Sequence, residues 1–295
     1  MKPSFSYKLI LLILKIKGIK KDFSKDPIDY KKIRKEDIHT PKDKFFNSKF
    51  VRSFQIEKTK ITEITKEEIT NKLVIFIHGG AFISGPSKLH WDTAKYISTH
   101  TNHTVWMIDY PKAPENKIDS ISYNIDKVYE EALKTYKASD IALIGDSVGG
   151  TLSTTLVQRL IKDKKEIPGK LILVSPVMDS SLTNPKIEAI DKTDPMLGKI
   201  GILSAKRLCA GTVELKNPII SPLYESFNDF PATLFFLAEN DITFPDQQLA
   251  VQKIEKTNTV LTAIIGKNMP HVWPFLPVLK EAKIALNEIV LQLNK

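Results

Sequence analysis

Residues 141–152 read IALIGDSVGGTL, an apolar run that ends in a serine set among glycines. The apolar run predicts a buried strand, and the helical spacing of residues 151–163 predicts a helix soon after it. A Gly-x-Ser-x-Gly turn between a strand and a helix is typical of a strained turn that exposes a nucleophilic serine. Ser147 is therefore a candidate nucleophile, and a plain strand-to-helix turn is the alternative interpretation.

The rest of the chain alternates between strand and helix patterns on both sides of this turn. Strands are expected at residues 51–57, 61–64, 73–78, 104–109, 141–145, 171–175, 232–238 and 260–265. Helices are expected at residues 90–100, 120–136, 151–163, 247–257 and 277–293. This alternation predicts an α/β fold with a mostly parallel central sheet and helices on both of its faces. In such sheets the functional residues follow the carboxyl ends of the strands.

The strand expected at residues 73–78 is followed by two adjacent glycines. Adjacent glycines let the backbone approach a ligand closely and turn its N–H groups inward. Such groups stabilise the oxyanion of a tetrahedral intermediate, each by about 2.7–4 kcal/mol. The expected donors of this oxyanion hole are the N–H groups of Gly79, Gly80, Ala81 and Val148. A tight turn that needs glycine for its backbone alone is the alternative.

A serine nucleophile needs a base, and the base needs an acid that orients it. His271 is the only histidine that follows Ser147 in the chain. The acid is expected after the preceding strand, where Asp241 is favoured and Glu239 and Asp246 are nearby alternatives. Taken one at a time, His271 and Asp241 are equally well explained as an ordinary loop histidine and a turn or helix-capping aspartate. Their order at successive strand ends favours a Ser147-Asp241-His271 triad.

The length and the cysteine content fit a globular protein of the cytoplasm. A chain of 295 residues suits one large domain or two modest ones. The single cysteine, Cys209, cannot form an intrachain disulfide, which fits a reducing, cytoplasmic location. Because Cys209 lies beside no partner motif, a buried apolar thiol is favoured over a catalytic one.

The positive charge lies almost entirely in the N-terminal segment. Residues 1–60 hold 17 Lys and Arg against 7 Asp and Glu, and the whole chain carries +9. The body is therefore close to neutral, and since no nucleic-acid-binding motif is present, we expect no nucleic-acid partner.

The apolar run at residues 9–14 is too short to span a bilayer, which takes about 20 residues, and no signal-peptide cleavage site follows it. Its apolar residues point almost all round a helix, so we expect it to pack on the protein body. A weak membrane-surface contact through the basic N-terminus is the alternative.

Five stretches together resemble the hormone-sensitive-lipase-like family of α/β-hydrolases, also called alpha/beta hydrolase fold-3. HGGAF at residues 78–82 is similar to the family's HGGG motif, and GDSVGG at residues 145–150 is similar to its GDSAGG motif. DYPKAPEN at residues 109–116 resembles D-Y-R-L-A-P-E, and AENDITFPD at residues 238–246 resembles E-x-D-x-L-x-D. MPHVWPF at residues 269–275 resembles the family's histidine motif. The resemblance runs from about residue 70 to the end of the chain.

This resemblance implies an α/β-hydrolase fold of about eight strands, with a catalytic domain at residues 51–295. It implies a helical cap made by residues 1–50 and by an insertion at about residues 180–215. The cap would shape the acyl pocket, and the pocket-lining candidates are Phe82, Trp273 and Phe275. Packing of these aromatic side chains in the core is the alternative.

The resemblance also assigns roles to the motif residues. It carries the catalytic acid onto Asp241 and the base onto His271, and it makes His78 a support of the oxyanion loop. Ala81 replaces the third glycine of the family motif but keeps its N–H, and Lys112 stands where the family has leucine.

The expected activity is hydrolysis of carboxylic esters with short to medium acyl chains through an acyl-enzyme intermediate. This chemistry requires neither a metal nor an organic cofactor. The expected partner is a small-molecule or lipid ester substrate. An amidase or deacetylase on the same triad, and a non-catalytic ligand-binding relative, are the alternatives.

Overall fold

The computed structural model describes residues 4–67 and 70–295, and within them eight strands form one sheet. The strands are β1 (Val51–Ile56), β2 (Thr59–Ile64), β3 (Leu73–Ile77), β4 (Thr104–Asp109), β5 (Ile141–Asp146), β6 (Lys170–Val174), β7 (Ala232–Ala238) and β8 (Leu261–Gly266). Their order across the sheet is β1-β2-β4-β3-β5-β6-β7-β8. The predicted fold class is confirmed.

The sheet is parallel from β4 to β8, and an antiparallel hairpin extends one edge. β1 pairs with β2, and β2 pairs with β4, both antiparallel. In the parallel part Leu73 of β3 lies opposite Thr104 of β4 and Ile141 of β5. Every residue of β3 and β5 is buried, which explains their continuous apolar sequences.

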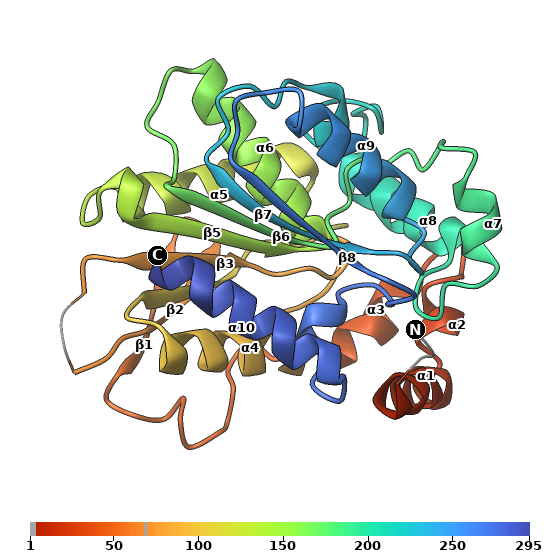
Figure 1. Ribbon diagram of the computed structural model, residues 1–295, viewed down its shortest axis with the longest axis horizontal. Helices are drawn as coiled ribbons and strands as arrows, with labels where there is room; N and C mark the ends of the chain where they lie inside the picture. The colour runs from red at the N-terminus through yellow and green to blue at the C-terminus, as the bar shows by residue number, and fades with distance from the viewer. Residues whose placement is uncertain (1–3, 68–69) are drawn as a thin grey trace.

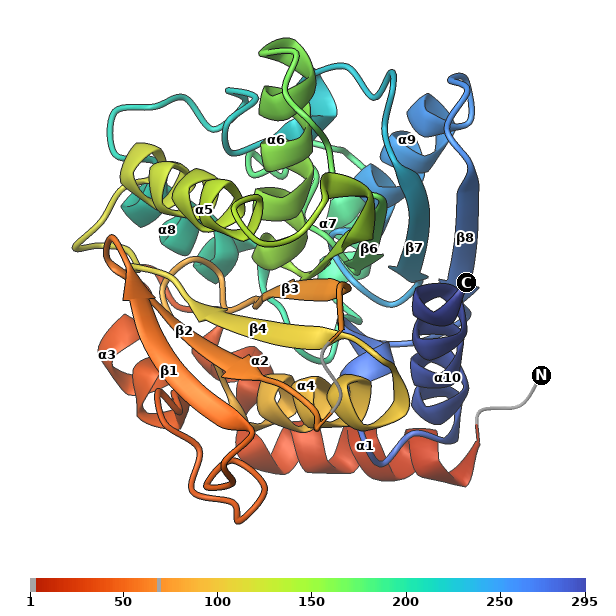
Figure 2. The same ribbon diagram turned by 90° about the vertical axis from the view of Figure 1, so that its left-hand side faces the viewer.

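Helices cover both faces of the sheet (Figures 1 and 2). The α-helices are α1 (Phe5–Lys17), α2 (Ile19–Asp22), α3 (Tyr30–Ile33), α4 (Lys88–His100), α5 (Ile118–Ala132), α6 (Val148–Lys162), α7 (Ile187–Asp191), α8 (Lys199–Ala210), α9 (Phe244–Ile254) and α10 (Lys280–Asn294). Short 3-10 helices lie at η1 (Arg34–Glu36), η2 (Ala138–Asp140), η3 (Pro222–Tyr224) and η4 (Trp273–Phe275). In Figure 2, α5, α6 and α9 lie above the sheet, and α4 and α10 lie below it, with α1 beneath them.

The alternation of side chains along each strand divides the core into two layers. Ile75, for example, packs in the layer with α5 and α6, and its neighbour Phe76 packs in the layer with α4 and α10. Cys209 lies buried in the first layer as a free thiol, as predicted. Apolar burial on both faces is the main force that holds strands of this kind in a sheet.

Two helical segments that are far apart in sequence lie together beyond the carboxyl ends of the parallel strands. Figure 1 shows α2, α7 and α8 gathered there. The Lys20 ammonium donates to the Asp191 carbonyl at 2.6 Å, and the Ile28 N–H donates to the Ser204 hydroxyl at 3.0 Å. The insertion expected at about residues 180–215 contains α7 and α8.

The N-terminal helix packs on the body with one of its sides only. Tyr7, Ile10 and Leu14 of α1 are buried in the layer with α10, and the opposite side of the helix is exposed. Within residues 4–67 and 70–295, no helix has the length and apolar character needed to cross a membrane.

Candidate active site

The turn between β5 and α6 holds Ser147 in a strained backbone conformation. Ser147 has φ 51° and ψ −121° and is the N-cap residue of α6. A non-glycine residue in such a conformation costs of order 1–3 kcal/mol. The helix begins at Val148, three residues earlier than predicted, so the strained serine passes directly into the first helical turn. The turn is held because Ser147 N–H donates to the Val174 carbonyl at 2.9 Å.

The two glycines that flank Ser147 are required by close approach of the backbone. A Cβ on Gly149 would lie 1.9 Å from the Ile77 carbonyl oxygen. A Cβ on Gly145 would lie 2.4 Å from the Gly149 carbonyl oxygen. Helix α6 therefore packs against β3 and β5 at a distance that no other residue type permits at these two positions.

His271 and Asp241 form a buried pair after β8 and β7. The distance between His271 Nδ1 and Asp241 Oδ2 is 2.6 Å, and the two residues are 4% and 0% exposed. Asp241 Oδ1 accepts hydrogen bonds from the N–H and hydroxyl of Thr243, both at 2.8 Å. Burial disfavours the imidazolium, but the Asp241 carboxylate outweighs burial, and the pKa of His271 is raised above its ordinary value.

The alternative acids are directed elsewhere. Glu239 accepts a hydrogen bond from the N–H of Asn268, and Asp246 accepts one from the side chain of Asn184. Among the described residues, Asp241 is the carboxylate that hydrogen-bonds to His271.

The structure brings Ser147 and His271 to the same edge of the sheet through the chain that follows β6. Ser147 is tied to Val174, and the Ser175 hydroxyl accepts a hydrogen bond from the Val272 N–H at 3.1 Å. No hydrogen bond joins the Ser147 hydroxyl to His271 in the described part of the chain. Catalytic hydrogen bonds are often long in unliganded enzymes and tighten when substrate binds.

In the described part of the chain, the loop after β3 and the start of α6 present backbone N–H groups that have no hydrogen-bond partner. For Gly80, Ala81 and Val148, no acceptor faces the N–H group within residues 4–67 and 70–295. Gly80 has φ 114°, and Ala81 has φ 55°, so the loop turns sharply here. These three donors are available to a developing oxyanion.

Gly79 differs from the prediction. Its N–H donates to the Asp146 carboxylate at 2.9 Å, so this N–H is already occupied. The expectation that Gly79 contributes to an oxyanion hole is therefore wrong. The bond instead ties the loop to the residue that precedes Ser147.

His78 lies beneath this loop as a neutral side chain. Burial holds the pKa of His78 well below its ordinary value. Because a carbonyl oxygen can only accept, His78 Nδ1–H is the donor in the 2.6 Å hydrogen bond to the Gly79 carbonyl. The imidazole stacks on the Tyr110 ring at a centroid distance of 4.5 Å, and the Tyr110 hydroxyl donates to the His78 carbonyl at 2.9 Å. These contacts are consistent with the expected role of His78 as a residue that supports the loop after β3.

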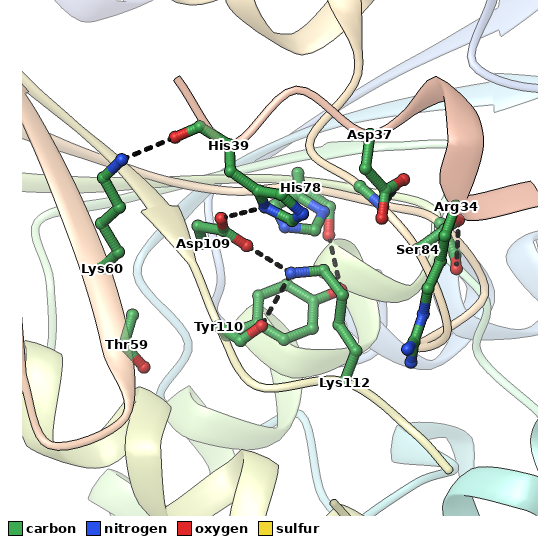
Figure 3. A network of polar contacts seen from close by, with 12 residues as sticks. Arg34, Asp37, His39, Thr59, Lys60, His78, Ser84, Asp109, Tyr110 and Lys112 are labelled. Atoms are coloured by element: carbon green, nitrogen blue, oxygen red, sulfur yellow. Dashed lines mark hydrogen bonds and ion pairs between the residues drawn. The ribbon is translucent and has the colours of Figure 1, made fainter. Parts of the chain in front are cut away.

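The N-terminal segment holds the far side of the same loop, which Figure 3 shows. Arg34 Nε donates to the Ile83 carbonyl at 2.7 Å, and Arg34 Nη2 donates to the Ala113 carbonyl at 2.6 Å. Asp37 Oδ1 accepts a hydrogen bond from the Gly85 N–H at 2.7 Å. Sequence reasoning missed both side chains because residues 1–50 carry no recognisable motif.

Lys112 replaces an apolar family residue with a buried ion pair. Its ammonium lies against the Asp109 carboxylate and donates to the Tyr110 carbonyl at 2.8 Å, as drawn in Figure 3. Burial lowers the pKa of Lys112, and Asp109 opposes that shift. On the other side Asp109 is 2.6 Å from His39 Nδ1.

A second carboxylate, Asp194, joins the inserted helices to the loop of Asp241. Asp194 Oδ2 accepts a hydrogen bond from the Ile242 N–H at 2.8 Å, and Oδ1 accepts one from the Leu197 N–H at 2.9 Å. Burial and the charge of Asp241 raise the pKa of Asp194 to about 6. No motif in the sequence singled out this residue.

The three aromatic pocket candidates are all buried. Trp273 packs edge-on against Phe236, and Phe275 packs against Phe76. For these two side chains, core packing accounts for the positions. Phe82 lies in the loop after β3 instead, and the ammonium of Lys206 from α8 lies 4.4 Å from the centre of its ring.

No cluster of three or more His, Cys, Asp or Glu side chains is arranged to hold a metal ion within the described ranges.

Comparison with known proteins places the chain in a family. Residues 74–275 match the family described as alpha/beta hydrolase fold. An esterase of Acinetobacter venetianus is 29% identical over 211 residues, which cover 70% of this chain and 69% of that protein. A triacylglycerol lipase of Mycobacterium tuberculosis is 26% identical over 182 residues, which cover 61% of this chain and 37% of that protein.

The fold matches solved structures over the whole chain. The crystal structure of an esterase from the bacterial hormone-sensitive lipase family superimposes with a TM-score of 0.83 at 22% identity, covering 100% of this chain and 99% of that one. The chain therefore belongs to the alpha/beta hydrolase fold family, and its architecture is that of hormone-sensitive-lipase-like esterases.

Proposed function

We propose that the protein is a carboxylic ester hydrolase that uses Ser147, His271 and Asp241 as its catalytic triad. The observation that carries the proposal is the 2.6 Å contact between His271 and Asp241 at the sheet edge where the strained Ser147 lies. The curated relatives named esterase and triacylglycerol lipase support the ester chemistry.

In this mechanism the Ser147 hydroxyl attacks the ester carbonyl, and His271 Nε2 takes its proton. Asp241 holds the His271 Nδ1–H and stabilises the imidazolium that forms. The N–H groups of Gly80, Ala81 and Val148 hold the oxyanion. His271 then protonates the leaving alcohol, and water, with His271 again as base, releases the acid from Ser147.

We also propose that α1–α3 and α7–α8 form a cap over this site. Ser147 and His271 are only 8% and 4% exposed, which supports an enclosed site. A site of this kind favours short to medium acyl chains, because a long chain needs an open channel.

A panel of p-nitrophenyl esters of increasing acyl length, hydrolysed by the wild type and by Ser147→Ala, tests the proposal. We expect a maximum at short or medium length and loss of activity in Ser147→Ala with an unchanged melting temperature. Residual activity of Ser147→Ala close to that of the wild type would refute the triad.

An amidase on the same triad is the competing function. Matched ester and amide substrates with the same acyl group distinguish the two, because ester cleavage should be the faster reaction. Faster turnover of the amide would reassign the enzyme. A folded wild-type protein whose Ser147 is not labelled by a fluorophosphonate would indicate a non-catalytic binding protein.

A further inference from the structure

Helix α1 carries apolar side chains on two opposite sides. One side is buried in the layer that also contains α10. The other side carries Phe5, Leu9, Leu12 and Ile16, which are 82%, 38%, 53% and 77% exposed. The helix is apolar all round because it presents one apolar face to the protein and a second one to its surroundings.

The exposed residues form a continuous stripe along the helix. They follow one another at intervals of four, three and four residues, and an α-helix has 3.6 residues per turn. Their side chains therefore project within a narrow sector along the full length of α1. In Figures 1 and 2 this helix lies at the outside of the molecule, with the body on one side of it. Single exposed apolar residues are ordinary, but an aligned set marks an interaction surface.

The charges of the helix are all positive. Lys8, Lys15 and Lys17 are exposed, and residues 5–17 contain no acidic side chain. Lys8 and Lys15 are seven residues apart, so they flank one edge of the stripe, and Lys17 lies near the border with the buried side of the helix. An apolar stripe with flanking lysines is typical of a helix that lies in the interface of an anionic membrane.

We propose that this outer face of α1, made by Phe5, Leu9, Leu12 and Ile16 with its flanking lysines, docks on the surface of an anionic lipid bilayer. The apolar stripe enters the boundary between headgroups and acyl chains, and the ammonium groups stay among the anionic headgroups. A second copy of the chain fits this face less well. A two-fold contact through α1 would bring lysines against lysines without any acidic side chain on the helix to pair with them.

The position of α1 connects the docked face with the candidate active site. The Ser6 hydroxyl accepts a hydrogen bond from the Lys280 N–H at 3.3 Å, so α1 contacts the start of α10. The inner face of α1 belongs to the same apolar layer as Trp273 and Phe275, which follow His271. A docked enzyme would thus hold the chain around His271 close to the lipid surface. This last step rests on the proposed function, whereas the docking itself does not.

Co-sedimentation of the full chain with vesicles tests the docking. One set of vesicles contains phosphatidylcholine with about one third phosphatidylglycerol, and the other contains phosphatidylcholine alone. We expect binding to the anionic vesicles that falls at least tenfold as salt is raised, and little binding to the neutral ones. Leu12→Ser combined with Ile16→Ser should reduce binding at least tenfold. Val260→Ser, at a position 73% exposed outside α1, is the matched control and should bind as the wild type does.

The melting temperature and the hydrolysis of a water-soluble ester show that the variants are folded. Both should stay unchanged in Leu12→Ser/Ile16→Ser, because these side chains lie on the exposed outer face of α1, and the face of α1 that packs toward the body and the proposed cap is made by Tyr7, Ile10 and Leu14. Absence of binding to anionic vesicles at low salt would overturn the proposal. So would a wild-type dimer in solution that the same double substitution converts to a monomer, since the face would then belong to a second copy. A wild-type protein that binds anionic vesicles but hydrolyses no ester would contradict the proposed function and would still support the docking proposal.

Discussion

Replacing Gly149 by alanine tests whether the close packing of α6 on β3 sets the geometry at Ser147. The new Cβ would lie 1.9 Å from the Ile77 carbonyl oxygen and 2.7 Å from its carbon. An ordinary contact between such atoms is about 3.2–3.5 Å, so the helix and the strand must separate by about 1.3–1.6 Å. Both atoms belong to backbone in the middle of the sheet, and neither can rotate out of the way.

A shift of this size moves Ser147 and the Val148 N–H relative to the loop of Gly80 and Ala81. Displacement of catalytic groups by about 1 Å costs about 100-fold in rate, which is about 2.7 kcal/mol of transition-state stabilisation. We therefore expect kcat for a short p-nitrophenyl ester to fall about 100-fold. Overpacking should also lower the free energy of unfolding by about 1–3 kcal/mol.

The assay is kcat per active site, with the number of reactive sites counted by a fluorophosphonate and folding followed by thermal melting. Gly18→Ala is the control, because a Cβ there meets nothing within 4 Å and the only burden is its φ of +67°. That variant should lose about 1 kcal/mol of stability and keep its kcat. A Gly149→Ala enzyme that is folded and has a kcat within threefold of the wild type would refute the reasoning.

Three further substitutions are expected to act through contacts that the structure describes. Asp241→Asn should lower kcat by about 10⁴-fold, because the amide oxygen stays on the donors of Thr243 and the amide NH2 then faces His271 Nδ1, which imposes the wrong tautomer. In the wild type kcat/KM should fall as the pH drops through the raised pKa of His271. In this variant the acidic limb should move to lower pH, because the carboxylate that most opposes the effect of burial is gone, and an unmoved limb would contradict the pairing. Lys206→Met should stabilise the protein by about 1–4 kcal/mol at pH 7, since the buried ammonium has no hydrogen-bond partner within residues 4–67 and 70–295, contacts only the Phe82 ring, and has its pKa lowered to about 7 by burial. The folded-state pKa lies below the unfolded value, so this gain should shrink between pH 7 and 10.5, which chemical denaturation at several pH values measures. A loss of stability at pH 7 would show that the contact of Lys206 with the Phe82 ring outweighs the cost of burying its charge. Arg34→Ala should lower kcat about tenfold with KM little changed, because two loop carbonyls lose their donor. Glu115→Ala, which removes only the half-exposed ion-pair partner of Arg34, should behave as the wild type. An Arg34→Ala enzyme that also keeps the kcat of the wild type would show that the loop does not depend on Arg34.

The parts of the molecule that sequence analysis predicted well are those where a local pattern and a backbone requirement coincide. The strands at residues 104–109 and 232–238 are found with the predicted bounds, because apolar runs buried on both faces leave no other solution. The strained serine follows from a turn that only glycine can flank.

The remaining parts depend on contacts between distant segments, which leave no local signal. Asp37 and Asp194 look like ordinary loop residues in the sequence, and only the fold places them on the N–H groups of Gly85 and Ile242. The assignment of Gly79 as an oxyanion donor was wrong for a related reason. The sequence shows that an N–H is present at that position, but not that Asp146 already accepts it.

The N-terminal segment has a consequence for the order of events during synthesis on the ribosome. Arg34 and Asp37 emerge first, yet they hold loop atoms of residues 83–113, and Lys20 reaches Asp191. The Ser6 hydroxyl accepts its hydrogen bond from the N–H of Lys280, the first residue of α10. These contacts can therefore form only in turn, those of Arg34 and Asp37 once residues 83–113 are made, and those of Lys20 and Ser6 once residues 191 and 280 are made. A nascent chain stalled before α10 should therefore already hold the loop of Gly80 and Ala81 beside Ser147, whereas α1 would still lack the surface of α10 on which it packs.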